Sequence, residues 1–146
     1  MSDPPVDPRG VRFAAAVTSV VLALVLVTGS VWLLAAQVAV FALAAFAGLR
    51  FAPYSAAFRV LVAPRIGAPG TREVAAPVRF SQAVGFAFAA VGLVGYAVGV
   101  PPLGITATAL ALVAAFLNAA FGFCLGCELY GLIARLRTTS TKGVSA

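Results

Sequence analysis

The chain has 146 residues, of which 62% are hydrophobic and 10% are charged, and its formal net charge is +6. Soluble domains are usually about one quarter charged, so this composition excludes an ordinary soluble domain and indicates an integral membrane protein. The absence of histidine and the presence of only two cysteines exclude Ser-His-Asp catalysis and most metal cages.

Two long uncharged runs predict where the membrane is crossed. No charged residue occurs from Phe13 to Leu49 or from Phe80 to Cys127, and one span needs about 20 apolar residues. Each run is therefore long enough for two crossings, with turn residues at 29–30 and 99–102. We expect an all-α membrane protein with four transmembrane helices in two tandem helical hairpins, at about 13–28, 31–49, 80–98 and 103–127.

The basic residues predict the orientation of these spans, because all ten lie outside the two uncharged runs. Positive loops stay cytoplasmic, so both termini and a basic central loop at 50–79 are expected on the cytoplasmic side. The loop should contact anionic lipid headgroups, and this distribution argues against a nucleic-acid partner. Within the loop, Tyr54, Phe58, Leu61 and Val62 share one helical face, so a short interfacial helix and an irregular loop are both compatible with the sequence.

The two ends of the chain predict no core of their own. Residues 1–10 contain three prolines and no apolar run, which is typical of a disordered tail. We therefore expect a disordered cytoplasmic tail at 1–10, a transmembrane domain at 11–136 and a cytoplasmic tail at 137–146.

Small residues recur along the third predicted span, where they would let helix backbones approach closely in lipid. They are Gly85, Ala89, Gly92, Gly95 and Gly99. The chain also contains two short internal matches, 8–13 with 77–80 and 41–46 with 116–121, which suggest a parallel duplication of one hairpin. The duplication would align the two cysteines with Leu49 and Ala52, so that only one copy carries thiols.

Cys124 and Cys127 carry the most obvious chemistry of the chain. On a continuous helix they lie at i and i+3 on one face, with Glu128 four residues after Cys124. Asn118 would point about 120° away from Cys124, unless a glycine breaks the helix. We therefore exclude Asn118 from the site and expect it to make a structural hydrogen bond between helices. Thiols on the cytoplasmic side are expected to be reduced rather than joined in a structural disulfide.

Several interpretations of the cysteine pair stay open. A redox or sulfur-carrying dithiol would react through a thiolate, which the nearby arginines favour and which Glu128 and a helix C-terminus oppose. The pair could instead bind Cu(I), although no cofactor is required. A quinone-linked thiol oxidoreductase similar to the vitamin K epoxide reductase type would need a second cysteine pair on the outer face. Finally, both cysteines could be buried structural residues, with Glu128 paired to a loop arginine.

A family resemblance rests on Arg79-Phe80, Asn118, Phe123-Cys-Leu-Gly-Cys127 and Tyr130. These residues resemble a small four-span bacterial membrane family catalogued as domain of unknown function four-three-nine-five, over about Asp7 to Leu136. The family has no established activity. Its members are often encoded near thioredoxin-like and sulfurtransferase-like proteins, so the resemblance implies a location in the bacterial cell (inner) membrane and a cytoplasmic partner of that kind.

Together these observations favour a cytoplasm-facing CxxC dithiol protein in thiol redox or sulfur handling. Its candidate catalytic residues are Cys124, Cys127 and Glu128. The alternative is a non-enzymatic membrane scaffold or transporter subunit with structural cysteines, and a hydrophobic bundle this small could also form a homo-oligomer.

Overall fold

The computed structural model describes residues 4–145, with side chains as far as Thr138. This part of the chain is all-helical, apart from one isolated antiparallel bridge between Val6 and Glu73. The α-helices are α1 (Pro8–Thr28), α2 (Val31–Ala42), α3 (Pro53–Ala57), α4 (Ala63–Ile66), α5 (Ala75–Ala97), α6 (Pro101–Phe121) and α7 (Leu125–Ser145). Three short helical turns complete the fold, η1 (Leu43–Ala47), η2 (Leu49–Phe51) and η3 (Phe58–Val62).

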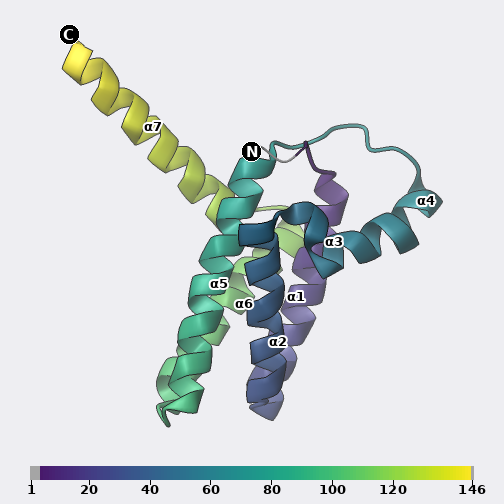
Figure 1. Cartoon of the computed structure of the whole chain (residues 1–146), viewed down its shortest axis with the longest axis vertical. Coiled ribbons are helices and arrows are strands. Elements are labelled where there is room, and N and C mark those ends of the chain that lie inside the picture. The colour runs from purple at the N-terminus through teal and green to yellow at the C-terminus, as the bar shows by residue number, and fades with distance from the viewer. Residues whose placement is uncertain (1–3, 146) are drawn as a thin grey trace.

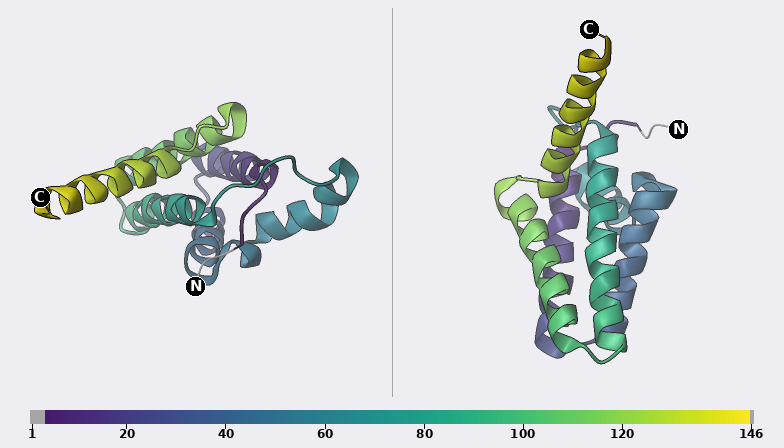
Figure 2. Two further views of the ribbon diagram at one scale, coloured as in Figure 1. Left: turned by 90° about the horizontal axis from the view of Figure 1, so that it is seen from above. Right: turned by 90° about the vertical axis from the view of Figure 1, so that its left-hand side faces the viewer.

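Helices α1, α2, α5 and α6 lie side by side in an upright bundle (Figures 1 and 2). Both α1 and α5 contact α2 and α6, so the four helices form a closed ring. The turn between α1 and α2 and the turn between α5 and α6 lie at one end of the bundle, whereas both chain termini lie at the other (Figure 1). The main hydrophobic cluster between the helices consists of Leu22, Val25, Leu34, Phe41, Ala89 and Ala111, and the polar side chains of Thr18, Gln37 and Thr108 are buried in the bundle as well.

Three helices of this bundle, α1, α5 and α6, are long and apolar enough to cross a membrane. Helix α2 continues into the π-helical turn η1, and together they form a shorter apolar helix, Val31–Ala47. The sequence predicted that this helix reaches residue 49. It ends earlier because Gly48 has a φ of 125°, a conformation that other residues rarely adopt.

The small residues of α5 pack against neighbouring helices, as the sequence predicted. A Cβ atom at Gly95 would lie 2.7 Å from the backbone nitrogen of Gly104 in α6, and one at Gly85 would lie 2.8 Å from the ring of Phe41 in α2. Close approach of α5 to both helices therefore depends on hydrogen in place of a side chain. Gly99 is an exception, because it serves the turn after α5 with a φ of 80° and has no neighbour within 4 Å.

The N-terminal segment is more structured than the predicted tail. Val6 exchanges two backbone hydrogen bonds with Glu73, at 2.9 and 2.8 Å. Helix α1 then begins at Pro8, because the side chain of Asp7 accepts a hydrogen bond from the backbone N–H of Arg9 and proline suits the first helical position. Residues 1–3 lie outside the described part of the chain.

The C-terminal prediction also needs correction. The fourth predicted span at 103–127 is in fact two helices, because α6 ends at Phe121 and α7 begins at Leu125. Helix α7 leaves the bundle at an angle (Figure 1) and continues to Ser145, so the predicted tail at 137–146 is helical as far as the structure describes it.

The helices of the central segment project sideways from the bundle near the end that carries the termini, and a loop then returns to α5 (Figures 1 and 2). The predicted interfacial face is only partly exposed, because Phe58 is buried beside Phe13, at a ring distance of 5.8 Å, whereas Leu61 is exposed. The hydroxyl of Tyr54 donates a 2.7 Å hydrogen bond to Oε1 of the buried Gln37 in α2. Gln37 therefore bonds to the central segment rather than to a neighbouring span.

Candidate functional site

The helix that the sequence extended through both cysteines is interrupted before them. Gly122 adopts a left-handed conformation with a φ of 68°, and its backbone N–H donates a 3.0 Å hydrogen bond to the carbonyl of Asn118. This is a common glycine termination of a helix. The chain then runs free of helix from 122 to 124 before α7 begins. The prediction of one continuous helix through the motif is therefore wrong.

Cys124 occupies the N-cap position of α7. Its Sγ accepts a 3.2 Å hydrogen bond from the backbone N–H of Cys127, and its carbonyl accepts a 3.0 Å bond from the N–H of Glu128. A side-chain acceptor that bonds the N–H three residues later is the usual arrangement of a helix N-cap, here with sulfur in place of oxygen. When the pair is reduced, a thiolate at this position is stabilised by the free N–H groups and by the helix dipole. The sequence reasoning had placed the pair at a helix C-terminus, where the dipole acts in the opposite direction.

Cys124 and Cys127 are joined by a disulfide, with their Cα atoms 5.2 Å apart. This separation lies within the range of unstrained disulfides. The sequence predicted reduced thiols, and the structure differs from this prediction because the two cysteines are bonded to each other. Both cysteines are partly accessible rather than buried, as a pair that reacts with another molecule must be.

Gly126, between the two cysteines, fixes the start of α7 against α5. A Cβ atom at this position would lie 2.6 Å from the Cα atom of Ser81, and it would also collide with the Ser81 Cβ. Phe80 and Tyr130 pack against each other one turn further on, with ring centroids 5.7 Å apart. The glycine of the motif is therefore required for helix packing, and it sets the position of the cysteines relative to the bundle.

A pocket of about 310 Å³ lies beside the cysteines. It is lined by Pro8, Val11, Arg12, Glu73, Val74, Pro77, Val78, Asn118, Gly122, Cys124, Cys127 and Glu128. Three of the predicted residues, the two cysteines and Glu128, thus meet in one pocket. Asn118 lines it as well, although the sequence reasoning excluded it, because the break at Gly122 cancels the helical angle on which that exclusion depended.

Asn118 was also expected to bond across to Thr18 or Ser19 in the first span. The hydroxyl of Ser19 instead donates to the carbonyl of Ala15 in its own helix, at 2.8 Å. The side chain of Asn118 makes no hydrogen bond to either residue in the part of the structure with described side chains. Its place in the pocket is therefore better explained by the site than by packing between helices.

Two charged residues of the pocket, Arg12 and Glu73, were not predicted. The guanidinium of Arg12 donates to the carbonyls of Ala119 and Ala120, at 3.2 and 3.4 Å, and so binds the C-terminal end of α6 just before the break. A cation is favourable at this end of a helix. Glu73 lies in the segment that pairs with Val6. The sequence match between 8–13 and 77–80 indicated that the segment of Arg12 belongs to an internal repeat, but it did not indicate that this arginine contacts α6.

The side chains that line the pocket limit the reactions and ligands that it can support. Among the described residues, no group of three or more His, Cys, Asp or Glu side chains is placed to hold a metal ion. The side chain of Glu128 is exposed, and it has no ion-pair partner among the side chains from 4 to 138, so the expected pairing with a loop arginine is absent there. The arrangement offers a dithiol or disulfide, with carboxylates nearby that can accept protons and an arginine that can hold an anion.

One family model, described as Domain of unknown function (DUF4395), matches residues 6–135. The match covers the whole bundle, the cysteine motif and the first part of α7. No curated protein and no solved structure matches the chain.

Proposed function

We propose that this chain, which belongs to the DUF4395 family, is a membrane protein that exchanges electrons with a cytoplasmic partner through Cys124 and Cys127. The observation that carries the proposal is the place of Cys124 at the N-cap of α7, where its Sγ accepts the N–H of Cys127. A pair of cysteines at a helix N-terminus is the arrangement in which thiolates form readily and disulfides are easily exchanged.

The exchange is a two-electron reaction. A thiolate of a reduced partner attacks Sγ of Cys124, the bond between the two cysteines breaks, and Cys127 leaves as a thiolate that takes up a proton. The second thiolate of the partner then attacks the mixed disulfide and releases Cys124 as a thiolate, which the N-terminus of α7 stabilises. The partner leaves oxidised and this chain is left reduced, and the reverse sequence returns the electrons. Glu128 borders the same pocket, and its carboxylate can deliver or accept the proton of Cys127.

We propose a four-span topology with both termini and the central segment in the cytoplasm of a bacterial cell, and with the chain in its inner membrane. The helix Val31–Ala47 is at the lower limit of about 17 residues for a span, and it lies in the bundle between longer helices. The ten basic residues fall outside the uncharged runs, so this orientation puts them all on the side that positive loops prefer. The central segment then contacts anionic headgroups.

The partner is a cytoplasmic protein with its own reactive thiols, of the thioredoxin-like or sulfurtransferase-like kind. A partner with two thiols accepts or supplies electrons as above, whereas a partner that carries a persulfide would transfer its outer sulfur to Cys124. The disulfide between Cys124 and Cys127 supports electron exchange, because it is the oxidised form that such a cycle requires.

Trapping of the mixed disulfide tests the proposal. In Cys127→Ser, Cys124 can still form a mixed disulfide, but this chain has no second thiol to resolve it. A cysteine-linked complex with a cytoplasmic thioredoxin-like protein that lacks its own second cysteine should therefore accumulate and should disappear on reduction. Cys124→Ser should give no complex, and the double serine variant is the background. Equal trapping by both single variants would contradict the special role of Cys124. Absence of trapping in Cys127→Ser, in a protein that remains folded, would favour structural cysteines in a scaffold or transporter subunit.

A further inference from the structure

A second cavity, larger than the cysteine pocket, lies apart from it in the described part of the chain. It has a volume of about 550 Å³ and lies among α1, α2, α5 and the central segment. Only Val11 and Val78 line both cavities, so these two side chains form the wall between them. Its volume is in the range of about 300–1,000 Å³ that is typical of ligand sites.

The inner walls of this cavity are mainly apolar, although Thr18 of α1 and Gln82 of α5 also line them. Ala14 of α1, Val40 and the buried Ala44 near the end of α2, and Val78 of α5 contribute to them. The central segment closes one side with Phe58, which is buried against the first turns of α1. Such walls accept a hydrocarbon chain, and they offer few hydrogen-bond partners to a polar molecule.

The charged residues that border the cavity are almost all positive. Arg50, Arg59 and Arg72 contribute to its lining. The guanidinium of Arg59 donates a 2.7 Å hydrogen bond to the carbonyl of Arg50, which holds it against the segment that lines the cavity. Asp7 is the only acidic residue in the lining, and its carboxylate is bound to a fourth arginine, Arg9, at 2.9 Å. The lining therefore carries three arginines against one carboxylate that is already paired, although the Arg50 guanidinium lies over the Phe51 ring, 4.8 Å from its centroid.

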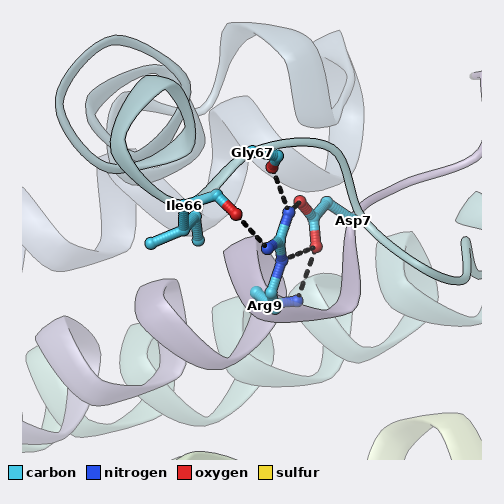
Figure 3. Close-up of polar contacts among 4 residues, drawn as sticks. All are labelled: Asp7, Arg9, Ile66 and Gly67. Atoms are coloured by element: carbon cyan, nitrogen blue, oxygen red, sulfur yellow. Dashed lines mark hydrogen bonds and ion pairs between the residues drawn. The ribbon is translucent and has the colours of Figure 1, made fainter.

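A set of polar contacts around Arg9, the Arg9 clamp, lies where α1 begins and the central segment passes it (Figure 3). The guanidinium binds the Asp7 carboxylate and donates to the carbonyls of Ile66 and Gly67, at 3.5 and 2.9 Å, where α4 ends. The paired backbones of Val6 and Glu73 cross beside it. These contacts join the start of α1 to the far end of the central segment beside the cavity, which stays partly open and is called the chamber below.

We propose that this chamber binds one anionic membrane lipid, with an acyl chain between the apolar walls and the headgroup phosphate at Arg50, Arg59 and Arg72. The geometry favours an anion, because guanidinium groups bind phosphate oxygens through paired, charge-assisted hydrogen bonds. A neutral lipid would leave the three arginines without a counter-charge. The inference depends on the membrane location proposed above but not on the thiol chemistry, since neither cysteine lines the chamber.

The binding is tested with purified full-length protein in nanodiscs of phosphatidylcholine and phosphatidylglycerol, which differ in headgroup charge. Lipid that stays with the protein after release into detergent is identified by native mass spectrometry. We expect phosphatidylglycerol to be retained. Arg59→Gln or Arg72→Gln should each weaken its retention about tenfold or more, the effect of one lost hydrogen bond to a charged group. Arg65→Gln is the matched control, because Arg65 is an arginine of the same segment that does not line the chamber.

A second variant pair tests the chain site. Ala14→Phe fills the chamber and should abolish retention of both lipids, whereas Ala16→Phe places the same ring on the exposed face of α1 and should have no effect. If Ala14→Phe does not fold, wild-type protein can be irradiated with phosphatidylglycerol that carries a photoreactive group at the end of its acyl chain. Cross-links to peptides around Ala14 and Val40 support the site, and cross-links confined to exposed helix faces overturn it.

Three further results would overturn the inference. Equal retention of both phospholipids would remove the role of the arginines. Preferential retention of a neutral isoprenoid quinone would show that the ligand is not an anionic lipid. Stabilisation of the protein by inorganic phosphate alone would show that the ligand is a soluble anion. Retention of phosphatidylglycerol by the double cysteine-to-serine variant is expected, and its loss in that variant would contradict the independence of the two sites. This control separates failure here from failure of the thiol proposal.

Discussion

Substitution of Gly126 by alanine tests how the motif is positioned. The added Cβ would lie 2.6 Å from the Cα of Ser81 and 3.4 Å from its nitrogen. The closest approach seen among real Cβ atoms is about 3.0 Å, and backbone atoms of Ser81 cannot rotate away as a side chain can. The start of α7 must therefore move away from α5 by several tenths of an ångström, and the cysteines move with it.

Overpacking of this kind costs about 1–3 kcal/mol, from which the better helix propensity of alanine subtracts up to about 1 kcal/mol. We expect a net destabilisation of about 1–2 kcal/mol in Gly126→Ala. Gly131→Ala is the matched control in the same helix, because nothing lies within 4 Å of its position. At position 131 no steric clash opposes the gain in helix propensity, so Gly131→Ala should be slightly stabilised.

The assay is thermal unfolding in detergent, together with the rate of cross-linking between α5 and α7. Gly126→Ala should lower the unfolding midpoint and Gly131→Ala should not. Ser81→Gly in the Gly126→Ala background should restore only part of the loss, because it removes the Ser81 Cβ but leaves the Cα. Equal midpoints for the two alanine variants would refute the packing of α7 on α5 at this glycine.

Three further predictions concern the rest of the fold. Gly95→Leu should lower the free energy of unfolding by more than about 3 kcal/mol, whereas Leu93→Ala should lower it by about 2 kcal/mol. Equal yields of folded protein from the two variants would show that α5 does not approach α6 closely. Tyr54→Phe should destabilise the protein by about 1–3 kcal/mol in chemical unfolding, because the buried Gln37 loses its partner and its Nε2 already has none among the described side chains; an unchanged midpoint would contradict this. The neighbouring arginine holds the pKa of Asp7 below its ordinary value of 3.8 through a side-chain hydrogen bond. The stability that this carboxylate contributes is therefore complete above 3.8 and is lost as the pH falls through the lower, folded value. Asp7→Asn should remove that acid dependence from amide exchange in the first turn of α1, and an unchanged acid dependence would show that another carboxylate is responsible.

The helices of the bundle could be predicted from the sequence because their causes are local. Uncharged runs, turn residues at 29–30 and prolines at 101–102 place the ends of the helices at these turns within a few residues, whereas α1 and α5 begin five residues before the predicted spans and α6 ends six residues before the predicted end. The small residues within α5 were also interpreted correctly, since Gly85, Ala89 and Gly92 at i, i+4 and i+7 leave one face of the helix open to a neighbour. For α5, the sequence therefore predicts both the helix and the face that packs against its neighbours.

The candidate site could be predicted only in part. The sequence named Cys124, Cys127 and Glu128, and the structure brings them into one pocket. It could not decide whether Gly122 continues or ends the helix, because glycine is tolerated in membrane helices as well as at their ends. That single conformation reverses the helix dipole at the thiols, and it brings Asn118 into the pocket.

Arg12 and the Arg9 clamp were beyond sequence reasoning for another reason. Each arginine bonds to carbonyls far away in the sequence: Arg12 to residues 119–120, and Arg9 to residues 66–67. Arginines near a predicted span are explained equally well by the orientation rule, so their charge alone does not identify a specific partner. Only the fold shows which carbonyls they reach.

The central claim is that Cys124 and Cys127 form a reactive pair on the cytoplasmic face, and sided thiol labelling tests it most directly. Intact cells and inverted membrane vesicles are treated with a membrane-impermeant maleimide, before and after mild reduction, and labelled cysteines are identified by mass spectrometry. We predict labelling only after reduction, only in inverted vesicles, and faster at Cys124 than at Cys127. Labelling from the outer face, or no labelling of the reduced and folded protein from either face, would contradict the account.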